Sequence, residues 1–194
     1  MSDGVPRPED WLASTTTAYN GSVEIEGEGL GRSEDGRLVR DIAGTLPILV
    51  KLLDSDERLV IQAHPTVPFA RARMNSPVGK TECWYFLPGT APDAYAYDGL
   101  SIEETCAKYV RRGADIPVSE PAARILGPDM TDKFEMWRLN GGGALPMDGR
   151  SAVVVVTDGE GSLNGGQVSK GDRLLVCGEQ SVSLAGTAVA VVCR

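Results

Sequence analysis

The chain has 194 residues, of which 42% are apolar and 24% charged, so it can bury the core of one ordinary domain or two small ones. Its net charge of −8 argues against non-specific nucleic-acid binding, which needs a basic face. It does not exclude a small anionic substrate, because a few lysines can reverse the field locally. No apolar run approaches the ~18 residues of a membrane span, and the polar start MSDGVPRPED lacks a signal core. We therefore expect a cytoplasmic protein that has neither nucleic-acid nor membrane partners.

The first 45 residues are polar and rich in glycine, which predicts short extended pieces and turns, with one turn at Asp35–Gly36. The apolar run LPILVKLLD follows over 46–54 and contains Lys51, which either extends its ammonium to solvent or faces a polar pocket. Strands are predicted over 57–65, where Pro65 ends the segment, and over 82–89. The segment PFARARM between them favours a short helical turn.

The strongest helix prediction covers 101–113, because Ser101 and Glu104 form a capping box and Gly113 follows Arg111 and Arg112. After a proline-rich loop over 117–128, the chain contains short apolar segments at regular spacing, separated by glycine turns. Such a pattern is typical of an antiparallel sandwich or jelly roll.

The four cysteines contain no C-x-x-C pair, which favours buried, reduced thiols over a disulfide framework. They are Cys83, Cys106, Cys177 and Cys193.

The chain contains a single histidine, His64, in the predicted strand over 57–65. Gln62 lies two residues earlier and therefore on the same face of that strand. Glu82 begins the next predicted strand, and a strand–turn–strand return can bring it against the first. One imidazole, one carboxylate and one amide oxygen suit a borderline divalent metal such as zinc.

An alternative interpretation needs no metal, because Gln62 and His64 can hydrogen-bond to each other and to Glu82. By default Lys80 is a solvated charge, whereas beside a metal site it could hold an anion. The segment Gly79–Lys80–Thr81 is not a phosphate loop, because Met74 stands where that motif requires glycine.

These residues resemble a known family. LPILVKLLDSDERLVIQAHP, followed by GKTECWYFL, is similar to the lvKlLda…lsiQvHP and GKtE.wy motifs of type I mannose-6-phosphate isomerases, which belong to the cupin superfamily. RPEDWLASTTT near the start resembles a further stretch of the family. KFEMWRLN…GEGSLNGGQVSKGDRLLV is similar to its second cupin unit.

The resemblance implies an all-β fold of two cupin-type jelly-roll units. An abridged metal-bearing unit would cover 1–116 and include the helix 101–113, and a smaller unit would cover 117–194. It implies that Gln62, His64 and Glu82 bind one zinc ion, that Lys51 and Lys80 line a sugar-phosphate pocket, and that Lys80 takes part in catalysis. The implied reaction interconverts mannose 6-phosphate and fructose 6-phosphate through an enediol.

The chain departs from the family pattern at several places, including Val60 in place of the family's usual serine and the segment after the helix. The family's fourth ligand is a histidine in a GTvHa segment after the helix, and this chain has no second histidine. The shortened first unit leaves sheet edges that a homo-oligomer could cover. The alternative function is a catalytically silent cupin that binds a sugar phosphate or a partner.

Overall fold

The computed structural model describes residues 9–12, 19–20, 23–24, 30–53, 64–85, 87 and 118–194. The chain forms two compact units, Met1–Ser55 with Ile116–Arg194 and Asp56–Asp115. The predicted helix over 101–113 and the predicted boundary at 116–117 lie outside the described residues, as do Gln62 and Cys106.

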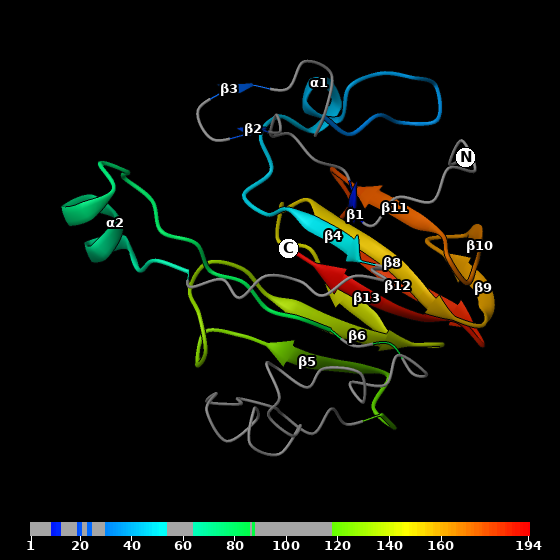
Figure 1. Cartoon of the computed structure of the whole chain (residues 1–194). Helices are drawn as coiled ribbons and strands as arrows, with labels where there is room; N and C mark the ends of the chain where they lie inside the picture. The colour runs from blue at the N-terminus through cyan, green and yellow to red at the C-terminus, as the bar shows by residue number, and fades with distance from the viewer. Residues whose placement is uncertain are drawn as a thin grey trace, which may run out of the picture. The chain divides into compact units, whose positions relative to one another are not determined.

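The described part of the first unit consists mostly of antiparallel strands (Figure 1). Its elements are β1 Glu9–Leu12, β2 Tyr19–Asn20, β3 Val23–Glu24, α1 Val39–Ala43, β4 Val50–Leu53, β5 Ala122–Leu126, β6 Met136–Asn140, β7 Ala144–Pro146, β8 Ala152–Asp158, β9 Glu160–Leu163, β10 Gly166–Ser169, β11 Arg173–Val176, β12 Ser181–Gly186 and β13 Val189–Cys193.

Two antiparallel sheets form a sandwich over residues 122–193. One sheet has the order β11-β8-β13-β6-β5 and the other the order β10-β9-β12-β7. Buried side chains from both sheets make one core, with Leu139 and Val154 on one side and Leu163 and Val182 on the other. The predicted all-β class is confirmed, and the arrangement is consistent with a cupin-like fold. Strands β6 and β8 to β13 occupy segments that the sequence predicted, because the chain alternates apolar strands with glycine turns. Strand β5 lies where the sequence predicted a proline-rich loop over 117–128, and it pairs with β6 at the edge of the five-stranded sheet.

Strand β8 is buried on both faces, which explains its uninterrupted valine run. Val154 and Val156 point into the sandwich core. Val153 and Val155 point the other way and pack in a second cluster with Leu12, Val39 and Leu46, together with partly buried residues of β4. The N-terminal segment therefore covers the outer face of the five-stranded sheet.

Strand β4 pairs with β1, and Lys51 lies opposite Trp11 in that register. Val50 and Leu52 face the second cluster, whereas Lys51 is exposed. The alternation along β4 thus directs the lysine to solvent, which is the first of the two placements that the sequence left open.

The thiol prediction is confirmed in part within the described residues. Cys193 is buried, whereas Cys83 and Cys177 are half-buried and form no disulfide. Partial burial, followed by the charge of Glu82, raises the pKa of the Cys83 thiol, so this thiol stays protonated at neutral pH.

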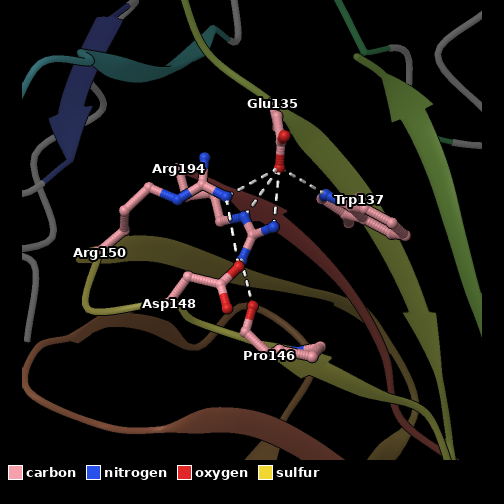
Figure 2. A network of polar contacts seen from close by, with 6 residues as sticks. All are labelled: Glu135, Trp137, Pro146, Asp148, Arg150 and Arg194. Carbon is pink, nitrogen blue, oxygen red and sulfur yellow. Dashed lines mark hydrogen bonds and ion pairs between the residues drawn. The ribbon is translucent and has the colours of Figure 1, made fainter. Parts of the chain in front are cut away.

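A polar network joins the start of β6 to the end of β13 (Figure 2). The side chain of Arg194 is 5% exposed and lies against Glu135, whose Oε2 accepts from Arg194 Nε at 2.9 Å and lies 2.8 Å from its Nη2. Trp137 donates its Nε1–H to the same oxygen at 3.2 Å, and Arg150 Nη2 lies 3.5 Å from it. Arg194 also donates to the Pro146 carbonyl oxygen.

Partial burial raises the pKa of Glu135, but hydrogen bonds from Trp137 and Arg194 and the charges of Arg194 and Arg150 outweigh that effect. The pKa of Glu135 therefore lies below its ordinary value. A carboxyl with a lowered pKa in the folded state stabilises that state at neutral pH, and the contribution is lost as the pH falls through the folded pKa.

In the part of the chain that the structure describes, no helix has the length and apolar character needed to cross a membrane.

The two-sided burial of β8 predicts that Val153→Thr, on the outer face, will lower the free energy of unfolding about as much as Val154→Thr, on the inner face. Each buries a hydroxyl group, and we expect about 1–3 kcal/mol from urea denaturation. Val118 is 69% exposed, so Val118→Thr is the matched control and should change little. A Val153→Thr effect as small as that of the control would show that the N-terminal segment does not cover the sheet.

The Glu135 network predicts that Glu135→Gln lowers the free energy of unfolding at pH 7 by about 1.5–3 kcal/mol, because the hydrogen bonds lose their charged acceptor. The loss should shrink as the pH falls through the lowered pKa of Glu135, where the wild-type carboxyl also becomes protonated. Asp132→Asn is the control, since Asp132 is exposed and forms an ion pair with the adjacent Lys133. Equal pH profiles for wild type and Glu135→Gln would contradict the assignment.

Candidate functional site

His64 is held by a turn and a short helix in the second unit. The helix α2, Val67–Arg73, begins at Thr66, whose side chain accepts from the Phe69 amide at 3.4 Å. Pro68 in its first turn favours this start, and Asn75, with φ of 50°, follows its C-terminal cap. The helical turn predicted for PFARARM is confirmed.

The segment that carries Glu82 returns alongside Pro65 through one close backbone contact. The Lys80 amide donates to the Pro65 carbonyl oxygen at 3.0 Å. A Cβ added at Gly79 would lie 2.8 Å from the Val67 nitrogen and nearer still to the Pro65 oxygen, so only glycine permits this approach. Gly79 therefore allows the two segments to lie side by side.

This approach brings together three of the five predicted site residues. His64 Nε2 lies 3.2 Å from Glu82 Oε2, and Lys80 Nζ lies 2.7 Å from the same oxygen. The side chains of His64 and Glu82 are 26% and 27% exposed, so solvent and small molecules can reach the cluster. The sequence predicted that Glu82 would return to His64, and the structure agrees.

The route of that return differs from the prediction. Residues 82–85 and 87 of the expected strand over 82–89 are described and are not in a strand. The Lys80–Pro65 hydrogen bond and the turn at Gly79 make the contact in place of a strand ladder. Periodicity alone could not distinguish a short extended loop from a strand, because both alternate their side chains.

Two predicted residues are not brought to this cluster by the described structure. Gln62 lies outside the described residues. Lys51 belongs to the other unit, where it is exposed on β4. Their parts in the site remain predictions.

Trp84 is a member of the cluster that sequence reasoning missed. Its Nε1–H donates to Glu82 Oε1 at 2.9 Å. The signal was a repeated spacing: Lys80-Thr-Glu-Cys-Trp84 and Lys133-Phe-Glu-Met-Trp137 both follow the pattern K-x-E-x-W. In both copies the indole donates to the glutamate two residues earlier.

The Glu82 carboxylate is surrounded by positive charge and hydrogen-bond donors. Partial burial raises its pKa, but the hydrogen bond and charge of Lys80, the charge of His64 and the hydrogen bond of Trp84 together lower it below the ordinary value. Glu82 is therefore ionised at neutral pH and is able to accept from cations or to bind a metal ion.

The donor set of His64 and Glu82 fits a zinc ion. Zinc takes imidazole nitrogen and carboxylate oxygen at about 2.0–2.2 Å, and two such ligands on a tetrahedral ion lie about 3.4 Å apart. The 3.2 Å between His64 Nε2 and Glu82 Oε2 is close to that value, and it also suits a direct hydrogen bond. Among the described residues, no third His, Cys, Asp or Glu joins them as a ligand group.

Comparison with known proteins relates the chain to one class of enzyme over short stretches. Mannose-6-phosphate isomerase ManA of Bacillus subtilis (strain 168) is 46% identical to this chain over 60 residues, which are 30% of this chain and 19% of that protein. The probable mannose-6-phosphate isomerase GmuF of the same organism is 49% identical over 41 residues, which are 21% of this chain and 13% of that protein.

A third relative, the mannose-6-phosphate isomerase of Streptococcus mutans serotype c, is 34% identical over 64 residues, or 32% of this chain and 20% of that protein. The chain thus spans a fifth or less of the length of the curated relatives that it matches. No family model matches the chain. The similarity is to mannose-6-phosphate isomerases, and it is partial.

The glycine requirement predicts that Gly79→Ala will separate the two segments of the cluster. We expect the Lys80 amide, which donates to Pro65, to exchange with solvent at least about 10-fold faster, since ~1.4 kcal/mol of lost protection gives that factor. Gly166→Ala is the matched control, because a Cβ there meets only the Leu163 oxygen at 3.5 Å. Unchanged Lys80 exchange in Gly79→Ala, measured by NMR, would disprove the close approach.

Proposed function

We propose that the chain is a zinc-dependent isomerase of the mannose-6-phosphate isomerase type, which interconverts mannose 6-phosphate and fructose 6-phosphate. The observation that carries the proposal is the 3.2 Å approach of His64 Nε2 to Glu82 Oε2, with the Lys80 ammonium on the same oxygen. The names of the three partial relatives support the same reaction class. The proposed location is the cytoplasm.

Gln62, His64 and Glu82 would hold the ion, with its fourth ligand unassigned. A bound zinc ion would polarise the substrate oxygens on which negative charge develops as a proton moves between C1 and C2. Only His64 and Glu82 lie in the described part of the chain, where their atoms are already adjacent. Little rearrangement of these two side chains is therefore needed for metal binding.

Lys80 would contribute positive charge to substrate binding. Its side chain is 48% exposed, and its ammonium lies 2.7 Å from Glu82 Oε2. A phosphorylated sugar brings negative charge to a protein whose net charge is −8, so a local cation is needed to offset the repulsion. The part of Lys51 in substrate binding stays a prediction from the family resemblance.

In the proposed reaction, His64 would bind the metal ion and would not transfer the substrate proton. Nε2 must be deprotonated to bind a metal, so the imidazole would act as a ligand and not as the proton carrier. We therefore assign the proton transfer to neither His64 nor Glu82. Lys80 contacts the Glu82 carboxylate, and in line with the family resemblance we propose that it takes part in catalysis.

A catalytically silent protein that binds a sugar phosphate is the second candidate. The ion pair of Lys80 with Glu82 favours it, because the carboxylate is satisfied without a metal ion. In that case Lys80 would still attract the phosphate, whereas no enediol chemistry would follow.

We predict that purified wild-type protein binds about one zinc ion per chain and that His64→Ala and Glu82→Ala each abolish this binding. Both residues would be ligands, and loss of one leaves too few donors. Elemental analysis after dialysis measures the metal content. Asp132→Asn, on the other unit, is the control and should keep its zinc. Equal zinc in wild type and in both ligand variants would refute the assignment.

Lys80→Ala is expected to weaken the binding of mannose 6-phosphate by roughly 10-fold, because one exposed cation near a phosphate contributes about 1 kcal/mol or somewhat more. Isothermal titration with the zinc-loaded protein measures the affinity. Lys133→Ala is the matched control from the second K-x-E-x-W segment. A coupled assay for fructose 6-phosphate separates the isomerase from the silent binder.

A further inference from the structure

The two oxygens of the Glu82 carboxylate have different partners. Trp84 donates its Nε1–H to Oε1 at 2.9 Å, whereas Lys80 and His64 both lie against Oε2, at 2.7 Å and 3.2 Å. We propose that Trp84 is a positioning residue that holds Oε1, so that Glu82 presents Oε2 alone to His64 and to a metal ion. This inference rests on the proposed function of the same cluster.

The chemistry of carboxylates explains what such a residue would do. A carboxylate can bind a metal through one oxygen or through both, and free rotation about its last bond exchanges the two oxygens. An N–H group held on Oε1 opposes both events, because its hydrogen bond is lost when that oxygen turns towards the ion. Partners of this kind in the outer shell of metal sites orient the ligands.

The second K-x-E-x-W segment shows that this division of oxygens is not a general result of the spacing. There the indole of Trp137 and the guanidinium of Arg194 share one oxygen, Glu135 Oε2, and Arg150 points at it as well (Figure 2). No histidine faces Glu135, since the only histidine is His64. The indole and the cations thus contact different carboxylate oxygens at Glu82, the glutamate that lies beside the candidate ligand His64.

The variant that tests the inference is Trp84→Phe, which removes the N–H and keeps an aromatic ring. Trp84 is 51% exposed, so the smaller ring leaves no large cavity. We expect the affinity for Zn²⁺ alone, measured by competition with a chelator, to fall by about 10- to 100-fold. Trp137→Phe removes the matching N–H at Glu135 and should leave the affinity unchanged.

Further measurements separate positioning from a general structural role. Trp84→Leu also lacks the N–H and should weaken zinc binding as Trp84→Phe does. The melting temperature of the metal-free protein should change little in either variant. The visible spectrum of bound Co²⁺ should change in both, because the coordination by Glu82 changes.

The outcomes are distinct. Wild type that binds no zinc overturns the proposed function and this inference with it. Wild type that binds zinc, with Trp84→Phe and Trp84→Leu equal to it in affinity and Co²⁺ spectrum, overturns the positioning role alone. Weakened binding that follows only a lowered melting temperature of the metal-free protein, with an unchanged Co²⁺ spectrum, also overturns it.

Discussion

A backbone hydrogen bond from the Lys80 amide to the Pro65 carbonyl oxygen sets how far His64 can lie from Glu82. The bond forms because Gly79 has no side chain to meet Pro65 and Val67. Lys80 and Glu82 then lie two residues apart on the same segment, so Glu82 reaches the imidazole of His64 and Lys80 reaches the carboxylate of Glu82. The contact between His64 and Glu82 therefore depends on a glycine at position 79, where even an alanine methyl group would clash.

Charge balance at Glu82 is the second constraint. One carboxylate receives an ammonium, an imidazole and an indole N–H, and these donors keep it ionised. The same balance can serve two purposes, because it satisfies the carboxylate without a metal ion and keeps it ready to bind one. The lysine is the exchangeable member, since it is half exposed and its long side chain can turn to a substrate phosphate.

The sequence predicted much of the fold and part of the site. Strands β6 and β8 to β13 follow from alternating apolar residues and glycine turns, and the meeting of His64 and Glu82 follows from their spacing. Burial of both faces of β8 was not predictable, because a valine run does not show which segment covers the second face. Periodicity also predicted a strand over 82–89, where the described residues make a loop contact. The pairing of Arg194 with Glu135 joins residues 59 apart in the sequence, and no local pattern indicates it.

His64 is the only histidine, so its imidazole gives one ¹⁵N signal pair that reports on the candidate site alone. The most direct test is an NMR titration of ¹⁵N-labelled protein with Zn²⁺. The account predicts that one equivalent of zinc shifts the Nε2 resonance, which faces Glu82, while Nδ1 keeps its proton. Resonances of Nε2 and Nδ1 that do not change at several equivalents of zinc would contradict it.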